Sequence, residues 1–215
     1  MGGNSAATQS RGCLFLLVSL VALLIGFPFL EDVARPLILV IPLAAVFVAS
    51  VVVVDSHRRH VRAALVIAVV QVGLTVASLV LRPAVILALL AMVVLILFST
   101  YCVLAYVLRA RVITRDQIYA GICMYLMFGY AFGAIFYLIN ILDPGSFISN
   151  QPAGSANTPD LMYFSFVTLA TLGYGDITPG TNIARSLAVL EALAGMIYIA
   201  VFMARLVSMR SVDDG

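Results

Sequence analysis

The residues best suited to chemistry form one short segment, the 171–176 loop, with the sequence Thr171-Leu172-Gly173-Tyr174-Gly175-Asp176. Its two glycines can adopt backbone angles that residues with a Cβ avoid. Successive backbone carbonyls can therefore point at one axis. Carbonyls arranged in this way bind a dehydrated cation such as K⁺, because they replace its water shell. In such a site the Thr171 hydroxyl would be the innermost ligand, and Tyr174 would point outward and brace the loop.

The residues before the 171–176 loop predict a short helix. Thr158, Pro159 and Asp160 supply a hydroxyl N-cap, a proline at the first helical position and an acid in the first turn. A helix from there to about Ala170 would be roughly 18 Å long, which is about half of a membrane. We therefore expect a re-entrant helix whose carbonyl end faces the membrane centre, where the helix dipole favours a cation.

The segments on either side of this helix and loop predict exposed connections. Residues 143–158 are rich in Gly, Pro, Ser and Asn, and they predict a solvated external loop. After the 171–176 loop, Pro179 would stiffen the exit, because its ring fixes the backbone φ angle.

The composition places these residues in a membrane. The chain is 63% hydrophobic and 10% charged, with a mean hydropathy of +1.13, whereas a soluble domain carries about 25% charged residues. The first apolar run lacks a small-residue cleavage site, so it predicts a retained span rather than a signal peptide. Runs long enough to cross a bilayer core lie near 13–30, 37–54, 63–81, 84–108, 118–142 and 183–207.

The arginines predict the orientation of these spans. If six spans are threaded in order, nine of the twelve basic residues fall on one side of the membrane. By the positive-inside rule, both termini are then cytoplasmic in a plasma membrane, and the segment between the fifth and sixth spans is external. The fourth span, 84–108, contains no charged residue. Voltage sensing by arginines in that span is therefore not expected.

The segment from Tyr163 to Pro179 resembles the pore helix and selectivity filter of the tetrameric potassium channel superfamily, in particular of bacterial channels of the two-transmembrane pore type. The resemblance extends over about residues 118–209. It implies a fourfold pore whose filter runs from Thr171 to Gly175. It also implies that K⁺ ions are bound in that filter by the Thr171 hydroxyl and by the carbonyls of Thr171, Leu172, Gly173 and Tyr174. No organic cofactor is implied.

Some positions of the resembling segment differ from the pattern of the superfamily. The residues expected to support the filter are Asp176, Tyr163, Phe164, Val167 and Thr168. Many members have a Trp pair where Tyr163 and Phe164 stand, and Phe164 cannot donate a hydrogen bond to Tyr174. Ala170 replaces a frequent threonine, and Val167 replaces a carboxylate found in some relatives. None of these differences removes a carbonyl ligand, so they concern filter stability more than selectivity.

Two residues of the last span are candidates for gating. Glu191 is its only acid, and a carboxylate within a membrane is a functional-site hypothesis because it needs a partner. It could form a structural hydrogen bond to the back of the pore helix, through Tyr163, Ser165 or Thr168. It could also act in a pH-sensitive gate, or face the cavity as an ion site. Gly195 could be a hinge, or it could allow close packing against the fifth span.

These observations predict an all-α membrane protein. We expect six transmembrane helices plus a re-entrant pore helix and filter loop, assembled as a homotetramer. Residues 1–112 would form a four-helix N-terminal transmembrane domain without voltage-sensing arginines. Residues 113–215 would form the pore domain, with an outer helix, the pore helix, the filter and an inner helix.

The expected function is passive, K⁺-selective conduction rather than catalysis. The chain has no Ser/His/Asp set, no His/Cys cluster and no phosphate-binding loop followed by Lys. The expected partners are three further copies of the chain and membrane lipids, with no nucleic acid. A K⁺ uptake transporter would repeat the filter-like loop, whereas this chain has one. A non-conducting scaffold subunit would not need an intact 171–176 loop.

Overall fold

The computed structural model describes residues 3–26, 35–54, 58–78, 81, 83–109, 114–149 and 158–210. The elements in chain order are α1 (Gly3–Gly26), α2 (Arg35–Val54), α3 (Arg58–Ser78), α4 (Pro83–Arg109), α5 (Arg115–Leu142), β1 (Phe147–Ser149), α6 (Thr158–Leu169), β2 (Ile177–Pro179) and α7 (Asn182–Arg210). Contacts divide the chain into a first unit, Met1–Leu126 with Met209–Gly215, and a second unit, Met127–Ser208. The expected domains 1–112 and 113–215 stay a prediction.

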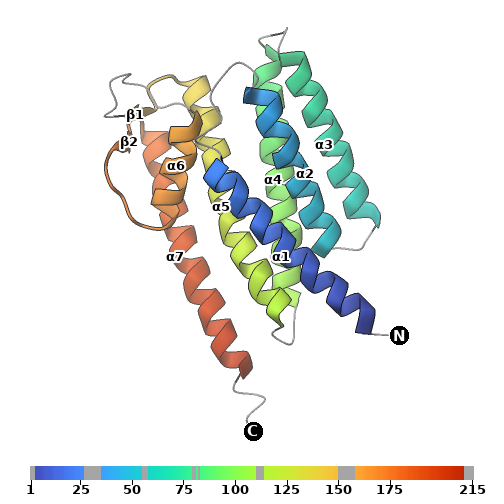
Figure 1. The fold of residues 1–215 in the computed structure, drawn as a ribbon. Helices are drawn as coiled ribbons and strands as arrows, with labels where there is room; N and C mark the ends of the chain where they lie inside the picture. Colours follow the sequence, from blue (N-terminus) through green and yellow to red (C-terminus); the bar gives the residue numbers. More distant parts are fainter. Residues whose placement is uncertain are drawn as a thin grey trace. The chain divides into compact units, whose positions relative to one another are not determined.

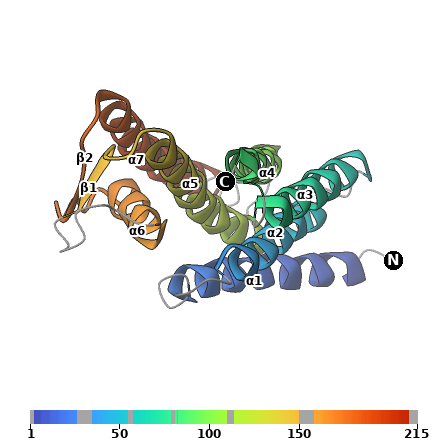
Figure 2. The ribbon, with the colours of Figure 1, turned by 90° about the horizontal axis from the view of Figure 1, so that it is seen from above.

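The first unit is built from apolar helices. α3 packs on α2 and α4, and α2 also packs on α1 and α4, as the two ribbon views show (Figures 1 and 2). A helix satisfies its backbone polar groups internally, which a membrane requires. Val51 of α2, Ala64 of α3 and Cys102 of α4 form a buried contact. The Ser99 hydroxyl donates a hydrogen bond of 3.1 Å to the Phe47 carbonyl and so joins α4 to α2.

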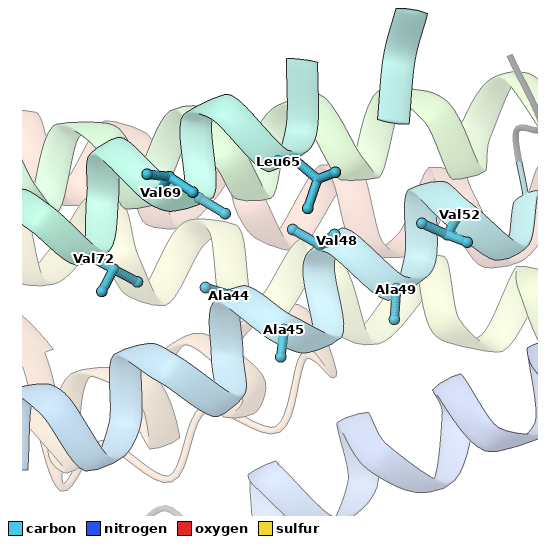
Figure 3. A pocket seen from close by; sticks show the side chains of 9 residues that line it. Ala44, Ala45, Val48, Ala49, Val52, Leu65, Val69 and Val72 are labelled. Atoms are coloured by element: carbon cyan, nitrogen blue, oxygen red, sulfur yellow. The ribbon is translucent and has the colours of Figure 1, made fainter. Parts of the chain in front are cut away.

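An open pocket of about 640 Å³ lies between α2 and α3 in the first unit (Figure 3). Its lining residues are all apolar: Ala44, Ala45, Val48, Ala49, Val52, Leu65, Ala68, Val69 and Val72. Because none of these side chains can donate or accept a hydrogen bond, the pocket suits apolar groups such as lipid chains and does not suit a polar ligand.

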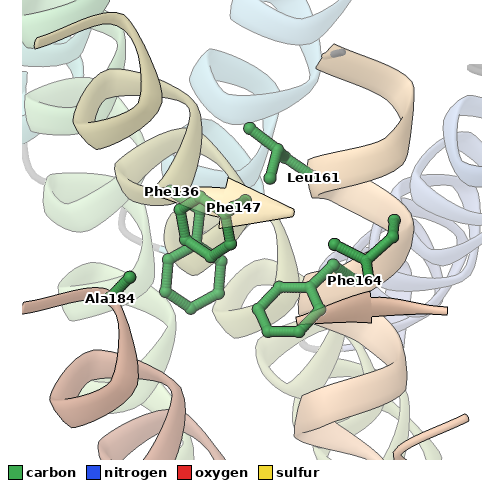
Figure 4. Packing of buried hydrophobic residues seen from close by; sticks show 6 residues of the cluster. Phe136, Phe147, Leu161, Phe164 and Ala184 are labelled. Atoms are coloured by element: carbon green, nitrogen blue, oxygen red, sulfur yellow. The ribbon is translucent and has the colours of Figure 1, made fainter. Parts of the chain in front are cut away.

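The second unit is assembled around α6. In Figure 1 this short helix lies beside α7, and the chain that follows it returns alongside the helix to β2. An aromatic cluster forms the core (Figure 4), and its members are Phe136, Phe147, Leu161, Phe164, Ile177 and Ala184. The rings of Phe136, Phe147 and Phe164 have centroids 5.2 to 5.4 Å apart in tilted and edge-on arrangements, which aromatic pairs favour. The cluster holds α6 against α5, α7 and both strands.

Four of the described helices are long and apolar enough to cross a membrane: α3, α4, α5 and α7. They correspond to four of the six expected spans. The apolar parts described for α1 and α2 are shorter, Gly12–Gly26 and Leu43–Val52. Parts of the expected spans 13–30 and 37–54 lie outside the residues whose side chains the structure describes. The count of six spans therefore stays a prediction.

Two segments expected as loops contain regular structure. The expected second and third spans leave a connection over 55–62, but the connection is shorter than this because α3 already begins at Arg58. The ring of His60, in the first turn of α3, packs edge-on against Phe98 with centroids 6.1 Å apart. The expectation of a solvated loop over 143–158 fits the exposed turn at 143–145 but was wrong for 146–149, and residues 150–157 lie outside the described part of the chain. After the turn β1 forms, and Phe147 is 1% exposed because it packs into the aromatic cluster.

Candidate functional site

The 171–176 loop is joined to the end of α6 by backbone hydrogen bonds. The Thr171 amide donates to the Thr168 carbonyl at 2.9 Å, and the Leu172 amide donates to the Val167 carbonyl at 2.9 Å. These two bonds form a Schellman motif, the usual helix end in which the residue after the cap adopts a left-handed conformation. Val167 and Thr168, which we expected to support the loop, therefore contact it through their carbonyl groups.

The backbone of the loop alternates in handedness. Thr171 has a φ of 58°, Gly173 of 58° and Gly175 of 78°. Leu172 and Tyr174, which lie between them, are not among the described residues with positive φ. In an ordinary strand successive carbonyls point to opposite sides, whereas an alternation of left- and right-handed residues turns them to the same side. The arrangement can therefore present a row of carbonyl oxygens to a cation.

Thr171 is the only residue other than glycine with a positive φ in the part of the chain that the structure describes. A β-branched residue in this region is an outlier, because its Cβ approaches the following carbonyl. Thr171, Gly173 and Gly175 lie two residues apart in the sequence, and this spacing is a signal that could have predicted the alternating backbone handedness. From the sequence, a left-handed backbone was predicted at the two glycines only.

The exit of the loop is fixed by contacts with the preceding segment and with α7. β2 follows the loop directly and pairs with β1 in antiparallel fashion. The Gly180 amide donates a hydrogen bond of 2.8 Å to the Ser146 carbonyl. The Arg185 guanidinium donates one of 3.1 Å to the Pro179 carbonyl. Neither contact could be predicted from the sequence, because the first depends on the pairing of β1 with β2 and the second on how the chain turns from β2 into α7.

Two neighbouring aromatic residues of α6 contact different parts of the site. Tyr163 is 41% exposed, and its side chain lies near Asp176 at the end of the loop. Phe164 is 7% exposed and packs into the aromatic cluster. Tyr163 thus lies near the end of the loop, whereas Phe164 anchors α6 to the core of the unit.

Glu191 of α7 is completely buried. Of the three residues considered as partners, the structure brings Ser165 to it, with 2.5 Å between Ser165 Oγ and Glu191 Oε1. Ser165 Oγ is also 2.7 Å from the Gly129 carbonyl oxygen of α5. The other carboxylate oxygen, Glu191 Oε2, has no hydrogen-bond partner among the described residues. The side chain therefore connects α7 to the back of α6.

Glycines allow α5 and α7 to approach α6 closely. A Cβ built on Gly129 would lie 2.5 Å from the Phe166 ring, and one built on Gly195 would overlap the Leu169 carbonyl oxygen. Gly195 was expected either to act as a hinge or to pack against the fifth span. The structure places it against the end of α6, directly before the 171–176 loop, and its role as a hinge stays a prediction.

Comparison with known proteins relates the second half of the chain to ion channels. A model of a family described as "Ion channel" matches residues 121–211. Two pore potassium channel c of Oryza sativa subsp. japonica is 36% identical over 95 residues, 44% of this chain and 20% of that protein. Inward rectifier potassium channel Kirbac3.1 of Paramagnetospirillum magnetotacticum is 44% identical over 57 residues, 26% of this chain and 19% of that protein.

A third relative is covered over most of its length. Protein LctB of Bacillus caldotenax is 29% identical over 99 residues, 44% of this chain and 73% of that protein. The matches to the potassium channels, in contrast, span less than a quarter of each channel's length. No solved structure matches the chain. The similarity therefore concerns the residues that carry the 171–176 loop and its neighbouring helices.

Proposed function

We propose that the chain forms a potassium-selective channel, through which K⁺ crosses the membrane passively at the 171–176 loop. The observation that carries the proposal is the alternation of left-handed φ angles at Thr171, Gly173 and Gly175. This alternation occurs in a loop that continues from the carbonyl end of α6. The names of the potassium channels to which the chain is similar support the same function.

The loop would bind K⁺ with oxygen atoms in place of water. The carbonyls of Leu172, Gly173 and Tyr174 would form successive sites, and Thr171 would contribute both its carbonyl and its hydroxyl. Gly175 would give the chain the freedom to turn toward Asp176 and leave the ion path. The negative end of the α6 dipole would favour a cation on the inner side of the loop. Several adjacent sites would let ions displace one another.

The pore would require four copies of the chain, because one loop can surround only part of an ion. Every residue from Thr171 to Asp176 is exposed on the single chain, with Leu172 at 57% and Tyr174 at 66%. A homotetramer around a fourfold axis would cover these residues and close each ring of carbonyls. We place it in the plasma membrane with both termini in the cytoplasm, as the distribution of arginines favours.

The channel would not be gated by arginines in the fourth helix. α4 carries no charged residue over 84–108, so the membrane potential has no charge there to move. We assign gating to the second unit instead, where Glu191 and Gly195 of α7 both contact α6.

The test is ion flux from proteoliposomes that contain the purified protein. We expect K⁺ flux without Na⁺ flux, and loss of K⁺ flux in Gly173→Asp, which places a side chain and a charge in the row of carbonyls. Gly145→Asp is the matched control, because Gly145 also has a positive φ, 98°, with open space around it. It lies in the turn before β1, so its K⁺ flux should persist.

Two results would overturn the proposal. Equal flux of K⁺ and Na⁺ would mean that the loop does not select between the ions. Absence of flux from a verified tetramer, at every voltage and pH tested, would favour a non-conducting scaffold.

A further inference from the structure

Three oxygen atoms from three helices form a short chain behind the 171–176 loop. They belong to the Gly129 carbonyl of α5, the Ser165 hydroxyl of α6 and the Glu191 carboxyl group of α7. Ser165 Oγ lies 2.7 Å from Gly129 O and 2.5 Å from Glu191 Oε1. Ser165 and Glu191 are both completely buried, so no solvent water can reach these oxygen atoms to donate or accept a hydrogen bond.

The number of hydrogen atoms that these two contacts require determines the protonation state of Glu191. Both distances are those of O–H···O hydrogen bonds, so two hydrogens are needed. The Ser165 hydroxyl supplies one, and a carbonyl oxygen supplies none. If Glu191 were ionised, one of the two contacts would join two acceptors without a hydrogen. If Glu191 is protonated, it donates to Ser165, Ser165 donates to Gly129, and both contacts are satisfied.

The surroundings of Glu191 also disfavour a charge. Its Oε2 atom is buried without a hydrogen-bond partner in the described part of the chain, and a buried carboxylate without a cation is costly. Within the second unit, Met127–Ser208, the other titratable or charged side chains of the elements packed around it are Tyr130 and Tyr137 of α5, Asp160 and Tyr163 of α6, Tyr174 and Asp176 of the loop, and Arg185, Tyr198 and Arg205 of α7. Ser165 is the hydrogen-bond partner that the structure gives the carboxyl group.

We propose that Glu191 carries a proton in the conducting channel and is a positioning residue for the 171–176 loop. It acts through Ser165, which fixes the rotation and depth of α6 relative to α5 and α7. The carbonyls of Val167 and Thr168, within the next turn of α6, hold the first amides of the loop. Gly195, one turn further along α7, contacts Leu169 at the end of the same helix.

Loss of the proton would break this connection. An ionised Glu191 can accept the Ser165 hydrogen, but Ser165 then has none for Gly129, and a charge is left beside α6. We therefore expect K⁺ flux, which rests on the proposed channel function, to fall when alkaline pH removes the proton. Glu191→Gln keeps a neutral side chain whose amide can donate to Ser165, so its flux should not depend on pH in this way.

The protonation state is measured directly by infrared spectroscopy of the purified tetramer. A buried protonated acid gives a carboxylic C=O band that an ionised carboxylate lacks. We expect this band in the unmodified protein, its loss in Glu191→Gln, and a shift of its frequency in Ser165→Ala, where the acid loses its acceptor. Asp143→Asn is the matched control, because Asp143 is an exposed acid of the same unit. It should leave the band unchanged.

Flux is then measured against pH for the same four proteins. In the unmodified protein and in Asp143→Asn, we expect K⁺ flux to fall as the band disappears. The decrease should be roughly tenfold, the factor that corresponds to the net free energy of one such hydrogen bond. Glu191→Gln should change less than about twofold over the same range. Ser165→Ala should have lower flux at every pH, because it lacks both contacts.

The results separate this inference from the channel proposal. Absence of the band under conditions of full flux, or a pH profile of Glu191→Gln equal to that of the unmodified protein, would overturn the inference. A Ser165-dependent band in a tetramer that passes no K⁺ would support the protonated Glu191 and overturn the channel function.

Discussion

Thr171 combines an unfavourable backbone conformation with a useful side chain. It occupies the position after the α6 cap, where helices most often place glycine, because the Schellman motif requires a left-handed residue there. A residue with a Cβ loses about 1–2 kcal/mol in that conformation. Glycine would remove this cost but would also remove the hydroxyl group. Stability alone therefore does not explain the threonine, whereas a hydroxyl ligand for K⁺ in the proposed channel would explain it.

Thr171→Gly should change stability and conduction in opposite directions. In a solution without K⁺, we expect the free energy of unfolding to rise by about 1 kcal/mol, because the left-handed conformation no longer strains a side chain. K⁺ flux and selectivity over Na⁺ should fall, because the innermost hydroxyl ligand is lost. Thermal unfolding and flux from proteoliposomes measure the two effects.

Thr171→Ser is the control for this comparison. Serine retains the hydroxyl group, so we expect selective K⁺ flux to persist. If Thr171→Gly keeps the full selectivity, the hydroxyl is not a ligand of the ion path.

At the scale of the elements, α6 is held from two sides by glycine contacts. Gly129 and Gly133 of α5 leave room for Phe166 and Met162, and Gly195 of α7 leaves room for the Leu169 carbonyl. The aromatic cluster adds an apolar anchor through Phe164. At these glycines the helix backbones approach one another closely. Close approach at small residues is a usual way for helices to associate in a membrane.

Gly195→Ala should destabilise the second unit, because its Cβ would overlap the Leu169 carbonyl oxygen. We expect a loss of about 1–3 kcal/mol in the free energy of unfolding, the usual cost of overpacking. The matched control is Gly73→Ala in α3, where nothing lies within 4 Å of the added atom. There the better helix propensity of alanine should stabilise by up to about 1 kcal/mol. Equal effects of the two substitutions on thermal unfolding would contradict the close contact.

The sequence predicted the elements whose signals are local. Thr158, Pro159 and Asp160 indicated the start of α6, and its end at Leu169 lies within one residue of the expected one. β1 was missed, because its pairing with β2 depends on a partner remote in the sequence and its flanking glycine and proline favoured a loop. The left-handed Thr171 was missed because threonine disfavours that conformation, so only the geometry of the helix end requires it.

Contacts between residues remote in the sequence could be predicted only in part. The sequence indicated that Glu191 needs a partner and offered the pore helix as one possibility, but it could not choose among Tyr163, Ser165 and Thr168. The choice depends on the rotation of α6 about its axis, which the aromatic cluster and the glycine contacts set. For the same reason, the sequence did not indicate the contact between Gly195 and Leu169 of α6.

At the scale of the whole molecule, the proposed tetramer would place like dipoles opposite one another. Rings of carbonyl oxygens repel when no cation lies between them, and K⁺ removes this repulsion. A bound ion that is absent from the unfolded chain stabilises the fold by mass action. K⁺ would therefore hold the four subunits together as well as pass between them.

We expect the melting temperature of the tetramer to be higher in K⁺ than in Na⁺ at equal ionic strength. At a K⁺ concentration of 100 times the dissociation constant, the added stability would be about 2.7 kcal/mol. Gly173→Asp should show no difference between the two ions, because its ring of carbonyls is disrupted. Equal melting temperatures of the unmodified protein in both solutions would contradict binding of K⁺ at these rings.

The contact between Gly195 and the Leu169 carbonyl has a mechanical consequence. If α7 bends at this glycine, the bend occurs at the point that touches the base of the 171–176 loop. In the proposed channel, any widening at the C-terminal end of α7 would then be transmitted as a displacement of Leu169, two residues before Thr171. The two ends of the ion path would not be independent barriers, and a motion that opens one would adjust the other.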